Sequence, residues 1–144
     1  GVLRTTVAPA AVDARTDKAA RRIARAVLNG LDYVGVVGIE LFDLGEGRLL
    51  VNEIAPRVHN TGHWTQDGCA CDQFEQHVRA VMGWPLGATL PHSRVEMTNL
   101  LGDEVDRWAA LSGKADLRIH LYGKSPARPG RKMGHLNRVR PLQH

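Results

Sequence analysis

The sequence contains little cysteine and few aromatic residues. Only Cys69 and Cys71 occur among 144 residues, too few for the disulfide framework that stabilises many small secreted domains. Aromatic residues make up 5% of the chain, and none lies among the basic residues between Lys124 and Lys132. Proteins that bind single-stranded nucleic acid usually need aromatic stacking platforms, so the composition does not favour that class.

Long apolar segments are missing as well. No run approaches the roughly 18 apolar residues needed to cross a bilayer, and the sequence does not open with the basic start and long apolar core of a secretory signal. We therefore expect no membrane partner and a cytoplasmic location. Hydrophobic residues make up 43% and charged residues 24%, which is ordinary for a globular domain.

The cysteines leave one metal site open as an alternative. The Cys69-x-Cys71 pair could bind zinc together with His63 and His77, which are near in sequence. Cysteines in zinc sites are usually separated by two to four residues. The plainer interpretation, two small residues at the start of a helix, is therefore favoured.

The basic residues are concentrated near the C-terminal end. The net charge is +4, and eight Lys or Arg residues but only one acidic residue, Asp116, lie between Lys114 and Arg140. Such a cluster attracts phosphate, either in nucleic acid or in a small phosphorylated metabolite. A basic nucleic-acid-binding module is thus a second interpretation, although it leaves the polar segment described below unexplained.

Hydrophobic periodicity predicts a mixture of helices and strands. The apolar stripes within 20–31 and at Phe74, Val78, Val81 and Met82 are expected to lie in the core. Helices are predicted at 13–31, 72–82 and 104–111, and strands at 3–8, 33–43, 48–54, 93–101, 115–122 and 133–139.

Two of these strands form a predicted hairpin around the turn 44–47. Glu40 and Glu53 stand at similar distances from the turn, so they can approach each other on neighbouring strands, where opposed Cβ atoms lie about 5 Å apart. Like charges opposed in a sheet repel, and a cation between them would relieve the repulsion.

An unusually polar segment follows the second hairpin strand. Leu49 to Gly68 reads LLVNEIAPRVHNTGHWTQDG, so a short apolar run ends in Asn52-Glu53 and leads into a loop with a guanidinium, two imidazoles and an amide. Loops on a rigid scaffold often carry function. This density of anion-binding and metal-binding groups predicts a site for a metal, a phosphate and a polar substrate.

This segment, NEIAPRVHNTGHWT, followed by DQFEQHVRAVMGWPLG, resembles the C-terminal part of the N5-carboxyaminoimidazole ribonucleotide synthase family, which are ATP-grasp ligases of purine biosynthesis. The family pattern is Asn-Glu-x-Ala-Pro-Arg-x-His-Asn-Ser-Gly-His, and Thr61 keeps the hydroxyl of the serine. Further similar segments occur in the family order at 34–42 (VGVVGIELF), 120–124 (HLYGK) and 128–137 (RPGRKMGHLN).

The resemblance implies an α+β fold. Residues 1–88 would form the C-terminal portion of an ATP-grasp domain with its active-site loop, and residues 89–144 a small β-rich C-terminal domain. The family also implies a homodimer and an N-terminal part of the same enzyme ahead of Gly1. This chain would then be a fragment that is inactive alone. A non-catalytic association domain is the remaining alternative.

The reaction implied by the resemblance is the carboxylation of 5-aminoimidazole ribonucleotide with bicarbonate. ATP phosphorylates bicarbonate to carboxyphosphate, and N5-carboxyaminoimidazole ribonucleotide, ADP and phosphate are released. ATP and Mg²⁺ are the implied cofactors, the two other substrates are the partners, and nucleic acid is not one.

The resemblance also assigns residues. Glu40 and Glu53 would hold Mg²⁺, and Asn52 with Glu53 would contact the nucleotide. Arg57 and His59 would be catalytic, because the planar fork of an arginine matches bicarbonate or carboxyphosphate. His63 receives no firm role, and His135 is expected to be structural. The ribonucleotide would be bound by Arg57, His59, Asn60 and Thr61, and its phosphate by Lys124, Arg128, Arg131 and Lys132.

Overall fold

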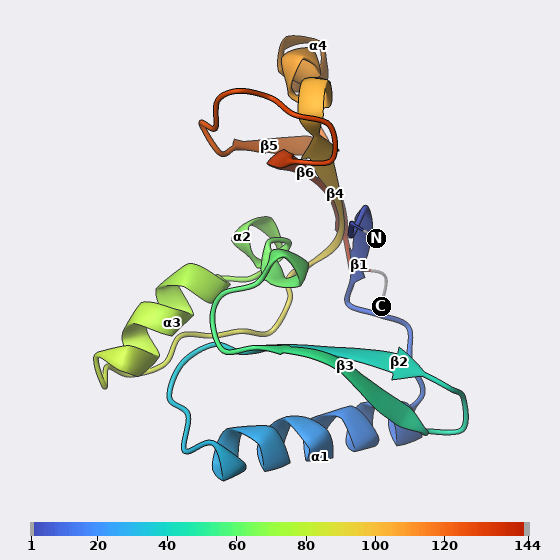
Figure 1. The fold of residues 1–144 in the computed structure, drawn as a ribbon, viewed down its shortest axis with the longest axis vertical. Helices are drawn as coiled ribbons and strands as arrows, with labels where there is room; N and C mark the ends of the chain where they lie inside the picture. Colours follow the sequence, from blue (N-terminus) through green and yellow to red (C-terminus); the bar gives the residue numbers. More distant parts are fainter. Residues whose placement is uncertain (1, 143–144) are drawn as a thin grey trace. The chain divides into compact units, whose positions relative to one another are not determined.

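The computed structural model describes residues 2–142, which form an α+β structure of two compact units (Figure 1). The sheet unit contains the described residues within 1–9, 64–70 and 89–144, and the hairpin unit contains residues 10–63 and 71–88. Both units combine segments that are far apart in the sequence. The predicted α+β class is confirmed, and the division of the chain at 88/89 stays a prediction.

The sheet unit is built on a four-stranded antiparallel sheet with the order β1-β4-β6-β5. Val95, Met97 and Asn99 of β4 are fully buried. They are every second residue of the strand, so they lie on the same face of the sheet. The elements of this unit are β1 (Thr5–Ala8), α2 (Thr65–Gly68), β4 (Ser93–Leu101), η2 (Gly102–Arg107), α4 (Trp108–Ser112), β5 (Leu117–Leu121) and β6 (Lys132–Pro141).

A polar cluster joins α2 to this sheet. Asp67 Oδ2 accepts hydrogen bonds from His120 Nε2 and from Asn137 Nδ2, both at 2.7 Å. His120 and His135 are paired across β5 and β6, and their rings stack with centroids 4.5 Å apart. Tyr122 continues the cluster through its hydroxyl, 2.8 Å from His135 Nδ1. His135 is 1% exposed, so it lies within the packed interior of this unit.

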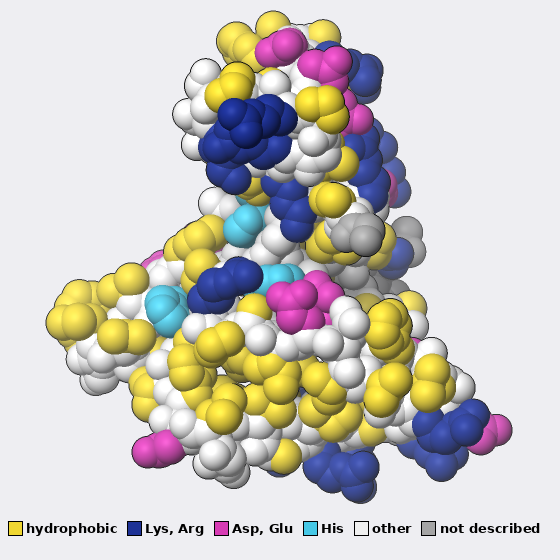
Figure 2. Space-filling view, viewed as in Figure 1, with side chains coloured by type: hydrophobic (Ala, Val, Ile, Leu, Met, Phe, Trp, Pro, Cys, Tyr) yellow, Lys and Arg dark blue, Asp and Glu magenta, His cyan; other side chains and the backbone are white. Residues whose placement is uncertain are grey.

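The hairpin unit consists of a β-hairpin with helices. Figure 1 shows α1 lying along one face of the hairpin, and Figure 2 shows Lys and Arg side chains projecting from the edge that α1 occupies. Asp13 and Asp72 cap the two long helices, each accepting from backbone N–H groups of the first turn, as N-cap residues do. The elements are α1 (Ala14–Gly30), β2 (Gly38–Asp43), β3 (Leu49–Ala55), η1 (Asn60–Gly62) and α3 (Gln73–Val81).

Most predicted elements are present, but the strand predicted at 33–43 begins only at Gly38. In the preceding segment, side chains satisfy the backbone groups that a partner strand would otherwise bind. The Tyr33 hydroxyl donates to Val36 O, and Val36 N donates to His77 Nδ1. Gly35 has a φ of 138°, which is incompatible with a regular strand of L-residues.

The helix predicted at 104–111 is also different, because six residues of 3₁₀ helix precede a short α-helix. Glu104 accepts from Leu101 N at 2.9 Å and forms a two-pronged ion pair with Arg4 at 2.6 Å. Hydrogen bonding to Arg4 and then to Leu101 N holds the pKa of Glu104 below its usual value. These contacts hold the start of the segment in a tight turn, so it does not form a regular α-helix.

The apolar stripe that begins at Phe74 was predicted to be core, and this is wrong for the described residues. Val78, Val81 and Met82 are 51%, 57% and 59% exposed. The period of a stripe identifies the apolar face of a helix, but it does not show whether the same chain covers that face.

The Asp67 cluster makes the stability of the sheet unit depend on pH. Burial alone would raise the pKa of Asp67, but hydrogen bonds from His120 and Asn137 outweigh it and hold the pKa below its usual value. The carboxylate therefore stabilises the fold above its unfolded-state pKa, and this contribution is lost as the pH falls through the folded-state pKa. We expect Asp67→Asn to lower the free energy of unfolding at neutral pH by about 1–3 kcal/mol and to flatten the acid limb.

Urea unfolding over a pH series measures this effect. Asp103→Asn, which changes an exposed carboxylate of η2 in the same unit, is the matched control and should leave both the stability and its acid limb unchanged. Equal pH profiles for wild type and Asp67→Asn would contradict the assignment.

Candidate functional site

The register of the hairpin places two carboxylates opposite each other. Glu40 of β2 pairs with Glu53 of β3, and the register shifts directly after Glu40, where Leu41 pairs with Val51. Asn52 is therefore the extra residue of a β-bulge. Consecutive strand residues normally face opposite sides, but a bulge can re-aim a side chain. Asn52 Nδ2 accordingly donates to Glu40 Oε2 at 3.0 Å. Its neighbour in sequence, Glu53, is the residue paired with Glu40.

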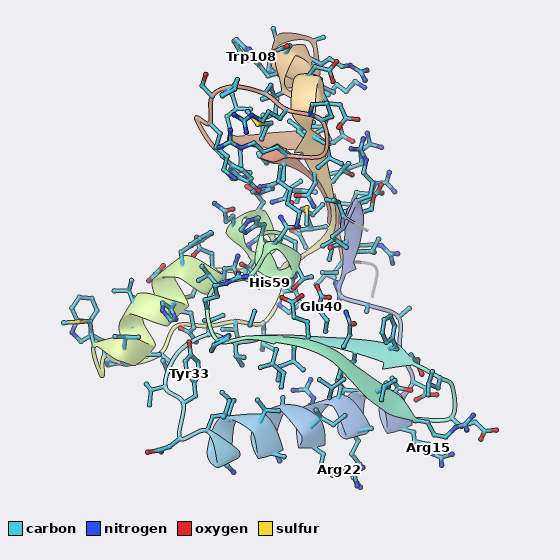
Figure 3. The ribbon with its side chains drawn as sticks, in the orientation of Figure 1. Arg15, Arg22, Tyr33, Glu40, His59 and Trp108 are labelled. Carbon is cyan, nitrogen blue, oxygen red and sulfur yellow. The ribbon has the colours of Figure 1, made fainter. Side chains whose placement is uncertain are left out.

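His59 lies beside both carboxylates. Its Nε2 is 4.0 Å from Glu40 Oε1 and 3.9 Å from Glu53 Oε1. Figure 3 shows Glu40 and His59 close together on the side of the hairpin opposite α1. The His59 side chain is 12% exposed, whereas those of Glu40 and Glu53 are 31% and 54% exposed. A largely buried imidazole thus borders a solvent-accessible carboxylate pair.

The contacts of the other ring nitrogen, Nδ1, indicate which tautomer His59 adopts. His59 is the N-cap of η1, and its Nδ1 accepts from Thr61 N at 3.5 Å. Thr61 Oγ1 lies 2.9 Å from the same nitrogen and can donate its hydroxyl proton. Because Nδ1 acts as an acceptor, the proton of a neutral ring is on Nε2. The ring therefore presents an N–H group toward Glu40 and Glu53.

Arg57 precedes this cluster on the same loop. It is exposed, and its Nη1 donates to Val58 O at 3.0 Å. No carboxylate within the described part of the chain forms an ion pair with it. Most of its planar donor fork is therefore available to an external anion.

The loop is held in place by Gln73, a residue that the sequence analysis did not select. Its side chain exchanges two 2.9 Å hydrogen bonds with the backbone N–H and C=O of His59. Its Nε2 also lies 2.7 Å from His63 Nδ1. Its sequence signals are its position directly after the helix cap Asp72 and its place in the family segment that begins DQFEQH, and neither predicts a contact with residues ten or more positions earlier.

The carboxylate pair is suited to a hard cation. Two opposed carboxylates in a hairpin repel, and Mg²⁺ is usually held by one or two carboxylates together with substrate phosphates. In the part of the chain that the structure describes, no group of three or more His, Cys, Asp or Glu side chains could hold a metal ion. The assignment of Glu40 and Glu53 as ligands of Mg²⁺ stays a prediction, in which a phosphorylated ligand would complete the coordination.

The zinc alternative is wrong for the described residues. Cys69 and Cys71 are buried, and they belong to different units. Cys69 Sγ lies 3.4 Å from Thr89 O, and Cys71 Sγ lies 3.3 Å from Gln76 Oε1. His77 Nδ1 accepts from Val36 N. These groups serve local packing and hydrogen bonding.

The four predicted phosphate-binding residues, Lys124, Arg128, Arg131 and Lys132, all belong to the sheet unit. Lys124 Nζ donates to Lys132 O at 3.1 Å and lies 5.1 Å from the centre of the Tyr122 ring. Arg131 donates to Arg128 O through its backbone and to Pro126 O through Nη1. Lys124, Arg128 and Arg131 thus lie in the loop between β5 and β6, and Lys132 begins β6, whereas Glu40, Asn52, Glu53, Arg57, His59, Asn60 and Thr61 all belong to the hairpin unit.

Similarity to known proteins covers nearly the whole chain. Residues 1–74 match the ATP-grasp domain family, and residues 96–143 match the phosphoribosylaminoimidazole carboxylase C-terminal domain. None of the described helices has the length and apolar character needed to span a membrane.

Individual relatives agree with these matches. The N5-carboxyaminoimidazole ribonucleotide synthase of Brucella melitensis is 52% identical over 98% of this chain and 39% of its own length. The Thermus thermophilus synthetase structure is 43% identical over 97% of this chain and 38% of its own, with a TM-score of 0.89. An Aspergillus clavatus enzyme, solved with ADP and 5-aminoimidazole ribonucleotide, is 34% identical with a TM-score of 0.91, over 98% of this chain and 40% of its own.

The chain therefore spans about two fifths of the length of these relatives. The family resemblance seen in the loop motifs is confirmed. This chain belongs to the ATP-grasp family, and its similarity is to the C-terminal portion of the N5-carboxyaminoimidazole ribonucleotide synthases.

Proposed function

We propose that this chain supplies the metal-binding hairpin and the substrate loops for ATP-dependent carboxylation of 5-aminoimidazole ribonucleotide with bicarbonate. One observation carries the proposal: Glu40 and Glu53 are paired across a bulged hairpin, with Asn52 and His59 beside them, in a chain 52% identical to a synthase of this reaction. Related structures contain ATP, or ADP with the ribonucleotide, which supports both as ligands of this site.

In this proposal Glu40 and Glu53 hold Mg²⁺, which supplies positive charge to the phosphates of ATP. Asn52 keeps one Glu40 oxygen in place through its 3.0 Å hydrogen bond. The other Glu40 oxygen, Oε1, stays on the side of His59 Nε2, which also lies near Glu53 Oε1.

Arg57 is proposed to bind the bicarbonate oxygens as they gain the terminal phosphoryl group of ATP. The P–O bond to ADP breaks as a bond from phosphorus to a bicarbonate oxygen forms. The amine nitrogen of the ribonucleotide then bonds to the carboxyl carbon, directly or after carbon dioxide is released. The bond from that carbon to the bridging oxygen breaks, phosphate leaves with this oxygen, and the proton lost by the amine passes to phosphate. An arginine suits this role because its fork can bind two oxygens of one anion.

Asn60 and Thr61 are proposed to contact the ribonucleotide together with His59, while Lys124, Arg128, Arg131 and Lys132 bind its phosphate. A dianionic phosphate requires several cations and backbone N–H groups, and Lys124 and Arg131 are already oriented by contacts within their loop. A homodimeric assembly and a cytoplasmic location also stay predictions.

A chimeric enzyme tests the proposed function. This sequence, joined to the N-terminal portion of the Brucella melitensis relative, should release ADP at a rate that depends on both bicarbonate and 5-aminoimidazole ribonucleotide. A folded chimera without such activity would contradict the proposal. Strong, salt-dependent binding of nucleic acid by the chain alone would instead support the basic-module interpretation.

Removing either carboxylate should abolish most of the activity. We expect Glu40→Gln and Glu53→Gln each to lower kcat of the chimera by about 10²- to 10³-fold, as for other groups that stabilise developing charge. Asp43→Asn is the matched control, because Asp43 is an exposed acid of the same hairpin that accepts from Gly45 N in its own turn. Steady-state ADP release measures the effect, and full activity of both glutamine variants would refute the metal assignment.

Removing the loop cations should weaken ribonucleotide binding. Lys124→Ala and Arg128→Ala are expected to raise the KM for the ribonucleotide by about tenfold, because charge-assisted hydrogen bonds contribute about 1.5–3 kcal/mol. The KM for ATP should change little. Lys114→Ala removes an exposed cation before β5 and serves as the control. An unchanged KM for the ribonucleotide in both loop variants would show that its phosphate binds elsewhere.

A further inference from the structure

We propose that Gln73 is a positioning residue that holds His59 in one orientation and one tautomer beside Glu40 and Glu53. This inference deepens the proposed function and rests on it for the catalytic consequence, but the structural claim can be tested without turnover. Gln73 acts on the carboxylates through its hydrogen bonds with the backbone of His59.

The contact has the form of a short strand pairing. Gln73 Oε1 accepts from His59 N, and Gln73 Nε2 donates to His59 O, both at 2.9 Å. The primary amide therefore binds both backbone groups of one residue. Two hydrogen bonds from a single planar group fix the direction of the peptide as well as its distance.

The second N–H of the same amide is also used. Gln73 Nε2 lies 2.7 Å from His63 Nδ1, and the His63 ring stacks on Phe74 with centroids 5.6 Å apart. Gln73 is 6% exposed. A buried amide with its oxygen and both of its N–H groups engaged is held firmly, because losing any one partner would leave a buried polar group unsatisfied.

Two glycines make this close approach possible. A Cβ at Gly62 would collide with Gln73 Oε1, and a Cβ at Gly38 would lie 2.7 Å from His59 Cβ. The first glycine lets the amide reach the loop, and the second lets the imidazole lie against β2. The loop, the helix and the hairpin are thus fitted together around His59.

The consequence of the clamp is a defined donor beside the carboxylates. With its backbone held by Gln73 and its Nδ1 facing Thr61, His59 presents Nε2–H toward Glu40 and Glu53 at about the same distance from each. Groups that orient the ligands of a metal site strongly affect affinity and activity. Misplacement of a reacting group by about 1 Å can cost 10²-fold in rate.

The same helix offers a matched control. Gln76 forms an equivalent pair of hydrogen bonds with Gly87. Its Oε1 accepts from Gly87 N at 2.9 Å, and its Nε2 donates to Gly87 O at 3.3 Å. Gln76 belongs to the same helix and the same unit as Gln73, but it clamps residue 87 and not the loop at 59–63. Gln76→Ala thus removes a similar clamp without touching His59.

The first experiment uses the chain itself, with Gln73→Ala, Gln76→Ala and the isosteric Gln73→Glu, which keeps an acceptor but loses both N–H donors. Amide hydrogen exchange at His59 and the nitrogen chemical shifts of its ring are measured by NMR. We expect wild type and Gln76→Ala to show a protected His59 amide and a single tautomer with the proton on Nε2. Both Gln73 variants should lose the single tautomer, and Gln73→Ala should lose the protection as well.

The second experiment places the same variants in the active chimera. Gln73→Ala and Gln73→Glu should lower kcat by about 10- to 100-fold and change the KM for the ribonucleotide little, while Gln76→Ala should retain kcat. An unaltered His59 tautomer in both Gln73 variants, or an equal loss of kcat in Gln76→Ala, would overturn the proposal. A wild-type chimera without activity would refute the proposed function, and the NMR result would then decide the positioning role alone.

Discussion

The site depends on one electrostatic constraint: the hairpin register holds Glu40 and Glu53 opposite each other on adjacent strands. Like charges at paired positions destabilise a sheet, so a hairpin has no structural reason to place them there. The bulge at Asn52 brings a neutral donor to Glu40, and the loop brings the Nε2–H of His59 near both carboxylates. These donors partly offset the repulsion and leave the carboxylate side chains accessible to solvent, an arrangement that suits the proposed binding of a cation.

Each unit organises two of its histidines through one polar side chain. In the hairpin unit Gln73 binds the backbone of His59 and the ring of His63. In the sheet unit Asp67 accepts from His120, which stacks on His135. Both arrangements satisfy a buried or half-buried polar group with several partners, and such networks specify one geometry because a partly satisfied network is costly. Gln73 begins α3 and Asp67 lies in the short helix α2, while His59 caps the turn η1.

The sequence predicted the hairpin, the helices that begin near Asp13 and Asp72, and the approach of Glu40 to Glu53, because alternation, helical periodicity and turn residues are local signals. It missed Gln73 and Asp67, whose partners are ten to seventy residues away, since one-dimensional periodicity carries no information about such contacts. The exposed stripe at Val78 and Val81 was misassigned for a related reason: burial depends on what covers a face. The family motifs, not the periodicity, identified the reaction.

The central claim is that this chain's carboxylates and loop serve the activation of bicarbonate by ATP. The most direct measurement follows heavy oxygen from labelled bicarbonate in the active chimera, with the released phosphate analysed by mass spectrometry. If the phosphoryl group passes to a bicarbonate oxygen, the released phosphate must carry an oxygen that came from bicarbonate. Phosphate that instead takes its new oxygen from water, at the same rate of ADP release, would contradict the account.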